Sequence, residues 1–108
     1  MKKEFVPYEQ AIALKELWFD EPCFAHYCNG DLITKTAILK SSTMLYYQQN
    51  NINPNNQYKH QNCTAPLYQQ AFRWLHQKLD IKKGVMPLDT ESQQLLLKEL
   101  IELCKKNN

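Results

Sequence analysis

The stretch TAPLYQQAFRWLHQKL, residues 64–79, separates into an apolar and a polar face more cleanly than any other part of this 108-residue chain. On a helix with roughly 100° between residues, seven apolar side chains fall within one arc. They are Leu67, Tyr68, Ala71, Phe72, Trp74, Leu75 and Leu79. Thr64 is a candidate N-cap, and Pro66 fits the first turn of a helix. We therefore expect a central helix over residues 64–79 that contributes the largest share of the core.

The opposite face of this helix is polar and almost uncharged. It consists of Gln69, Gln70, Arg73, His76 and Gln77. Such a face costs little to desolvate, and a central arginine is common in protein interfaces. These five residues are a possible interaction surface, toward another protein or a second copy of the chain. The simpler alternative is an ordinary solvated helix face.

Two further amphipathic helices are expected at the ends of the chain. Pro7 can begin the first, whose apolar face covers residues 8–18 and which must end before Pro22, because a residue that precedes proline is pushed out of the α region. Thr90–Lys106 is the last helix, and Thr90-Glu91-Ser92-Gln93 fits a capping box. Leu95 points away from its apolar arc. That arc is Leu96, Leu97, Leu100, Ile101, Leu103 and Cys104.

The sequence CFAHYCNGDLITK, residues 23–35, predicts a β-hairpin. Asn29-Gly30 supplies the positive φ angles of a two-residue type I′ turn. This turn pairs Cys28 with Asp31, Tyr27 with Leu32, His26 with Ile33 and Ala25 with Thr34. Of the two resulting faces, the more apolar one is expected to face the core. It carries Cys23, Ala25, Tyr27, Leu32 and Thr34.

Residues 41–63 form an Asn/Gln-rich segment. Ten Asn or Gln residues and a single charge, Lys59, occur in residues 41–62. Residues 43–47, TMLYY, have the content of a possible third strand, whereas the rest has too few apolar side chains to pack and predicts a long loop. An Asn-rich recognition loop is the alternative. Together these patterns predict one α+β domain over residues 1–108, with two layers: helix, β-hairpin with a possible third strand, long loop and two C-terminal helices.

The charge balance favours no class of partner. The net charge is +2, with five Lys and six acidic residues in residues 1–40 and five Lys and four acidic residues in residues 81–108. No apolar run approaches the roughly 20 residues of a membrane span, and the N-terminus lacks a signal-peptide core. These features predict a cytoplasmic protein without a membrane partner, whose four cysteines are reduced.

Five residues have side chains of the types that bind zinc: Cys23, His26, Cys28, His60 and Cys63. Zinc sites use closely spaced pairs such as CxxC, and strand alternation places Cys23 on the face opposite His26 and Cys28. We therefore expect buried or half-buried thiols beside surface histidines, with no metal or other cofactor.

No catalytic motif is recognisable. Cys63 with His60 or His76 is the single nucleophile-and-base combination, and it lies in no catalytic turn. Two glycines in the whole chain leave no phosphate-binding loop. We expect no catalytic residues and a non-enzymatic protein. Weak nucleic-acid binding is the alternative function, since the order helix, hairpin, strand and helix is shared with double-stranded RNA-binding domains, although the chain has no basic footprint.

Three stretches carry a resemblance to a known family: VPYEQAIALKELWFDEPCFAHYCNGDL, APLYQQAFRWLHQK and TESQQLLLKELIELCKK. They resemble a family of small proteins of tailed phages and bacterial mobile elements. The resemblance implies a phage- or prophage-type accessory protein in the cytoplasm, and it implies no activity. Trp18 stands where the family tends to have glycine, which implies that the first helix ends without the usual left-handed glycine cap.

Overall fold

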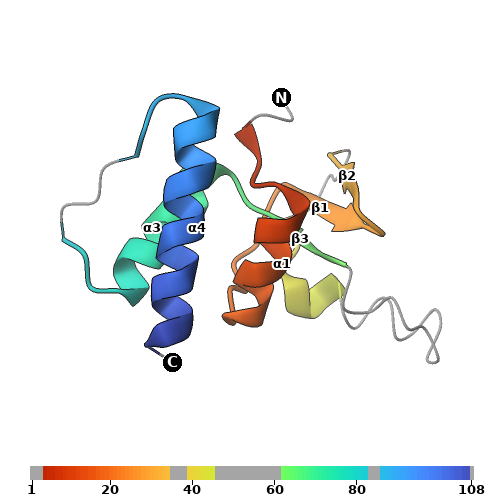
Figure 1. Cartoon of the computed structure of the whole chain (residues 1–108). Coiled ribbons are helices and arrows are strands. Elements are labelled where there is room, and N and C mark those ends of the chain that lie inside the picture. The colour runs from red at the N-terminus through yellow and green to blue at the C-terminus, as the bar shows by residue number, and fades with distance from the viewer. Residues whose placement is uncertain (1–3, 35–38, 46–61, 83–85, 108) are drawn as a thin grey trace.

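The computed structural model describes residues 4–34, 39–45, 62–82 and 86–107 (Figure 1). Its elements follow the order α1 (Tyr8–Glu16), β1 (Ala25–Cys28), β2 (Asp31–Ile33), β3 (Cys63–Ala65), α3 (Tyr68–Lys78) and α4 (Thr90–Lys106). Residues 42–45 form a further short helical segment. The α+β class is confirmed, with a hairpin after the first helix and two helices toward the C-terminus.

The described strands form one antiparallel sheet in the order β2-β1-β3. Asn29 has φ 54° and Gly30 has φ 89°, so both central residues of the hairpin turn are left-handed, as a type I′ turn requires. The predicted register is confirmed for His26 with Ile33, Tyr27 with Leu32 and Cys28 with Asp31. The predicted core face is also confirmed through its buried members Cys23, Ala25 and Tyr27. Thr34 is exposed beyond the end of β2.

The prediction of a third strand at residues 43–47 is wrong. Residues 42–45 are helical, and residues 46 and 47 lie, like the rest of the predicted loop up to residue 61, outside the described residues. The Ser41 hydroxyl accepts a hydrogen bond from the Met44 N–H at 3.2 Å, and the Asp20 carboxylate accepts one from the Thr43 N–H at 2.8 Å. These bonds satisfy N–H groups at the start of a helical turn and outweigh the β preference of TMLYY.

The third strand is instead β3, which pairs antiparallel with β1 through Ala25 and Ala65, His26 and Thr64, and Tyr27 and Cys63. Cys63 and Ala65 are completely buried toward the helices. Thr64 faces the other side of the sheet, where its hydroxyl lies 3.2 Å from that of Ser42 in the short helical segment. Thr64 is therefore a strand residue and not the N-cap that the sequence predicted.

The central helix α3 begins at Tyr68, later than predicted. Its N-cap is Leu67, which forms no side-chain capping bond, and Pro66 lies before the helix. The N-terminal segment pairs with this part of the chain: the Val6 N–H donates to the Pro66 carbonyl at 2.9 Å, and Phe5 forms an antiparallel bridge with Leu67. The backbone ladder thus continues past β3 and fixes the direction in which α3 leaves the sheet.

Helix α1 lies between the sheet and the other two long helices: it contacts both β3 and α4, and α3 packs against α4 (Figure 1). The core is formed by the buried side chains of these elements. The apolar arc of α3 is confirmed, with Leu67, Trp74 and Leu79 partly buried at its edges. Its fully buried members are Tyr68, Ala71, Phe72 and Leu75. No helix within the described ranges is long and apolar enough to cross a membrane.

The last helix, α4, has the predicted bounds and a different N-cap. The Asp89 carboxylate accepts the Ser92 N–H at 3.0 Å, so the cap is one residue earlier than the predicted Thr90. Hydrogen bonds from the backbone and the side chain of Ser92 lower the pKa of Asp89. Leu97, Leu100, Ile101 and Cys104 are buried. Leu96 is partly buried, whereas Leu103 is 46% exposed, contrary to its predicted place in the arc.

Helix α1 ends in a Schellman motif formed by a tryptophan. Trp18 is left-handed, with φ 74°. Its N–H donates to the Lys15 carbonyl at 3.0 Å, and the Phe19 N–H donates to the Leu14 carbonyl at 3.0 Å. The helix therefore ends without the usual glycine, as the family resemblance implied, and Trp18 forms the left-handed cap in its place. A residue with a Cβ pays roughly 1 to 2 kcal/mol for this conformation, and the Trp18 side chain is 83% exposed and recovers little by packing.

Trp18→Gly is expected to raise the free energy of unfolding by about 1 kcal/mol, because glycine adopts positive φ without the Cβ clash. Urea denaturation of the two proteins measures this difference. Trp18→Ala is the matched control, since it removes the indole and keeps the Cβ, and it should give no such gain. Equal stabilisation by both variants would show that the indole, and not the backbone conformation, carries the cost.

Candidate functional site

The residues on the polar face of α3 have two roles: one holds neighbouring parts of the fold together, and the others line an open hollow. Gln70 has the first role. Its amide nitrogen donates to the Glu21 carboxylate at 3.2 Å and to the Pro22 carbonyl at 3.1 Å. Its amide oxygen accepts the Cys23 thiol at 3.5 Å. Gln70 therefore holds the chain before β1 against α3.

The other four residues of the predicted interaction surface, Gln69, Arg73, His76 and Gln77, line a hollow of about 400 Å³. This α3 hollow lies between α3 and the chain that follows it. Its remaining lining residues are Phe72, Ile81, Lys82 and Met86. The structure thus brings four of the five predicted residues together, and it adds apolar side chains and a second cation that the helix pattern alone does not reveal.

The end of α3 builds one wall of this hollow. Asp80 is left-handed, with φ 58°. The Ile81 N–H donates to the His76 carbonyl at 2.8 Å, and the Asp80 N–H donates to the Gln77 carbonyl at 3.2 Å, which is a second Schellman motif. The chain therefore turns back at Asp80, so that Ile81 and Lys82 lie beside the last turn of α3.

The α3 hollow is basic. Arg73 and Lys82 carry full positive charges, and no Asp or Glu occurs among its described lining residues. Arg73 lies 3.7 Å from Glu21 outside the hollow, and its side chain is 65% exposed. Exposed ion pairs contribute only about 0 to 1 kcal/mol, so the guanidinium can turn to another carboxylate at low cost. The apolar part of the lining, called the apolar floor, consists of Phe72, Ile81 and Met86, and the Phe72 ring lies 6.0 Å from the His76 ring.

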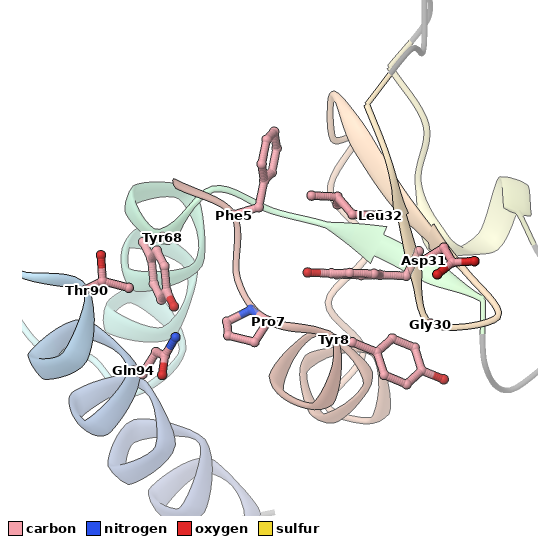
Figure 2. Close-up of a pocket in the computed structure, with 10 residues that line it drawn as sticks. Phe5, Pro7, Tyr8, Gly30, Asp31, Leu32, Tyr68, Thr90 and Gln94 are labelled. Atoms are coloured by element: carbon pink, nitrogen blue, oxygen red, sulfur yellow. The ribbon is translucent and has the colours of Figure 1, made fainter. Parts of the chain in front are cut away.

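A second cleft, of about 470 Å³, lies between the hairpin, the N-terminal segment and the first turns of α3 and α4 (Figure 2). Figure 2 shows Tyr68, Thr90 and Gln94 on one side and the hairpin turn on the other. We call it the tyrosine cleft. It is lined by Phe5, Pro7, Tyr8, Tyr27, Gly30, Asp31, Leu32, Tyr68, Thr90 and Gln94. No sequence pattern indicates this cleft, because its walls come from four separate parts of the chain.

The hydroxyl groups of the tyrosine cleft differ in their bonding. The Tyr27 hydroxyl donates to the Val6 carbonyl at 2.7 Å, and burial raises the pKa of Tyr27 to about 12. The Tyr68 hydroxyl is buried and makes no well-formed hydrogen bond among the described residues. Burial raises the pKa of Tyr68, and the nearby side chain of Gln94 partly offsets this rise. Asp31 is the single charged residue among the described residues that line this cleft.

The residues with zinc-binding side chains lie on two faces of the sheet. Cys23 and Cys63 are buried toward the core, His26 and Cys28 are half-buried on the alternate positions of β1, and His60 lies outside the described residues. No group of three His, Cys, Asp or Glu residues within the described ranges could hold a metal ion. Of the nucleophile-and-base combination, Cys63 is fully buried, whereas His76 lines the α3 hollow.

Burial raises the pKa of Cys23 to about 11 and that of Cys63 to about 12 from 9.0. Above pH 9 the unfolded chain therefore releases thiol protons that the folded chain retains, so the free energy of unfolding should fall as the pH rises from about 9 to 11. Urea denaturation at intervals from pH 8 to 10 measures this slope. In Cys23→Ala/Cys63→Ala the slope should become shallower, although the protein is less stable at every pH; an unchanged slope would contradict the assignment.

Comparisons with protein-family models, curated proteins and solved structures gave no match. The chain is therefore assigned to no family, and its resemblance to phage and mobile-element proteins stays an expectation.

Proposed function

We propose that the chain is a non-enzymatic protein-interaction module whose α3 hollow binds a carboxylate-bearing segment of a protein partner. One observation carries the proposal: Arg73 and Lys82 stand beside an apolar floor with no acidic residue among the described lining residues. Gln69 and Gln77 add neutral donors at the same rim. A carboxylate of the partner would form charge-assisted hydrogen bonds there, and an apolar side chain next to it would pack against the apolar floor.

The mixture of groups favours a protein over a nucleic acid as the partner. Nucleic-acid binding depends on several cations that neutralise successive phosphates, and the α3 hollow offers two full cations among its described residues. Its apolar side chains, Phe72, Ile81 and Met86, would gain nothing from a phosphate backbone. Weak nucleic-acid binding remains the alternative function, and a second copy of the chain is the alternative protein partner.

The biological setting that we propose is a phage- or prophage-type accessory role in the cytoplasm. It is supported by the resemblance of residues 6–32, 65–78 and 90–106 to small phage and mobile-element proteins. The resemblance names no partner. The proposal about the α3 hollow is independent of it, because the hollow follows from the positions of Arg73, Lys82 and the apolar floor.

Arg73→Glu is expected to reduce capture of the partner at least about fivefold, since it replaces the central cation by a repelling charge. The measurement is a tagged pull-down from bacterial lysate, quantified by mass spectrometry. Lys98→Glu is the matched control, because it makes the same charge change at an exposed position of α4 outside the hollow. The control should capture as much as the unmodified protein.

Treatment with salt and nuclease distinguishes protein binding from the alternative function, nucleic-acid binding. Parallel samples are washed at low and high salt, with and without nuclease. A protein that survives both treatments and is lost in Arg73→Glu supports the interaction module. Bound nucleic acid that salt removes would favour the alternative, and equal capture by Arg73→Glu and Lys98→Glu would rule out the α3 hollow as the binding surface.

A further inference from the structure

The α3 hollow and the tyrosine cleft are connected by a third hollow of about 410 Å³. This middle hollow shares Gln69 and Met86 with the α3 hollow, and Tyr68 and Thr90 with the tyrosine cleft. Each shared pair has one residue on α3 and one on the chain that leads into α4 or begins it. The three hollows therefore adjoin one another through these shared residues, and together they are called the groove.

The two ends of this groove have opposite charge. Arg73 and Lys82 line the α3 hollow, whereas Glu4 lines the middle hollow and Asp31 lines the tyrosine cleft. Among the described residues that line the groove, no Lys or Arg occurs outside the α3 hollow and no Asp or Glu occurs inside it. A ligand that fills the groove would have to match this change of sign along its length.

The groove also contains a buried polar group, the hydroxyl of Tyr68. Tyr68 lines both the middle hollow and the tyrosine cleft and is 3% exposed. Its hydroxyl makes no well-formed hydrogen bond within the described part of the chain, although the Gln94 side chain lies close to it. An unpaired buried hydroxyl is unfavourable, so a bound group that accepts its hydrogen bond would gain affinity. The backbone carbonyl of an extended peptide is such a group, because its strand-like conformation leaves carbonyls unpaired.

We propose that the groove binds an extended segment of the partner, with an acidic side chain in the α3 hollow and a Lys or Arg side chain in the tyrosine cleft. This inference rests on the proposed function, because the α3 hollow forms one end of the groove. At the other end, Asp31 attracts the cation, and the aromatic ring of Tyr8, which lines the same cleft, offers a surface on which an alkylammonium or guanidinium group packs well (Figure 2). A backbone carbonyl between the two charged side chains accepts from Tyr68.

Four dye-labelled peptides test this proposal by fluorescence anisotropy with the full chain. Two have opposite charges at their ends, EELFSLKK and KKLFSLEE, and cover both chain directions. The uniformly charged controls are EELFSLEE and KKLFSLKK. Each peptide is long enough to reach across adjoining hollows, since eight extended residues span at most about 28 Å. One of the mixed peptides should bind about three- to tenfold more tightly than either control.

Asp31→Lys provides a charge-swap test of the tyrosine cleft. This variant should lose affinity for the mixed peptide and gain affinity for EELFSLEE, so that the preference between them is reversed. Glu99→Lys is the matched control, because it makes the same charge change at an exposed position of α4 outside the groove. The inference is wrong if the preference is the same in Asp31→Lys and Glu99→Lys, or if no peptide binds.

Tyr68→Phe tests the central hydrogen bond. The variant should bind the preferred peptide about two- to tenfold more weakly, while its thermal unfolding temperature stays equal or rises, because the hydroxyl makes no well-formed hydrogen bond with the described residues in the free protein. A lower unfolding temperature with unchanged peptide affinity would instead give this hydroxyl a purely structural role and contradict its part in binding.

The outcomes separate this inference from the proposed function. If Arg73→Glu weakens binding of the acidic peptides while Asp31→Lys leaves the preference unchanged, the α3 hollow binds carboxylates and the longer groove does not bind a bipolar segment. If Arg73→Glu has no effect on any peptide, both proposals fail. A concentration-dependent dimer in sedimentation equilibrium, abolished by Arg73→Glu, would identify a second copy as the occupant and overturn the bipolar-peptide proposal.

Discussion

The antiparallel pairing of β3 with β1 is the constraint on which the rest of the structure depends. Residues 63–66 are almost completely buried, so their backbone polar groups need partners within the protein. Ala65 pairs with Ala25 in β1, and the next residue, Pro66, accepts the Val6 N–H from the N-terminal segment. This short stretch therefore ties the hairpin, the start of α1 and the start of α3 together, and it places the tyrosine cleft where these three parts meet.

The ends of α1 and α3 show a second constraint, which is conformational. Both helices end in Schellman motifs, and the left-handed positions are occupied by Trp18 and Asp80 and not by glycine. Asp and Asn adopt the left-handed conformation with little strain, so the strain at Asp80 is modest. The strain is larger for a bulky residue such as Trp18. The turn at Asp80 brings Ile81 and Lys82 back against α3 and thereby creates the α3 hollow. A hollow made in this way has one wall of rigid helix and one wall of irregular chain.

The parts of the fold that could be predicted are those with a local cause. Asn29-Gly30 determines the hairpin register because few other pairs adopt two consecutive positive φ angles, and the apolar arc of α3 follows from helical periodicity. The strand β3 could not be predicted: three residues, all buried, show no alternation, and Thr64 followed by Pro66 looks like the start of a helix. At residues 42–45, hydrogen bonds to Asp20 and Ser41 override β propensity, and Asp20 is too distant in sequence to signal this.

Only part of the candidate site could be predicted from the sequence, because only part of it has a local cause. The polar, weakly charged face of α3 could be identified, but its division into two roles depends on what packs beside each residue. Gln70 is one helical turn from Arg73, yet its amide is bonded to Glu21, Pro22 and the Cys23 thiol, whereas Arg73 has one long ion pair at 3.7 Å.

This difference follows from the cost of ordering a side chain. A half-buried amide with three partners is fixed in the free protein and offers a ligand little. An exposed guanidinium, held weakly, can exchange Glu21 for a partner's carboxylate without leaving a buried charge unpaired. The same helix can thus anchor the chain before β1 with Gln70 and present a cation with Arg73, because different segments of the chain pack beside the two side chains.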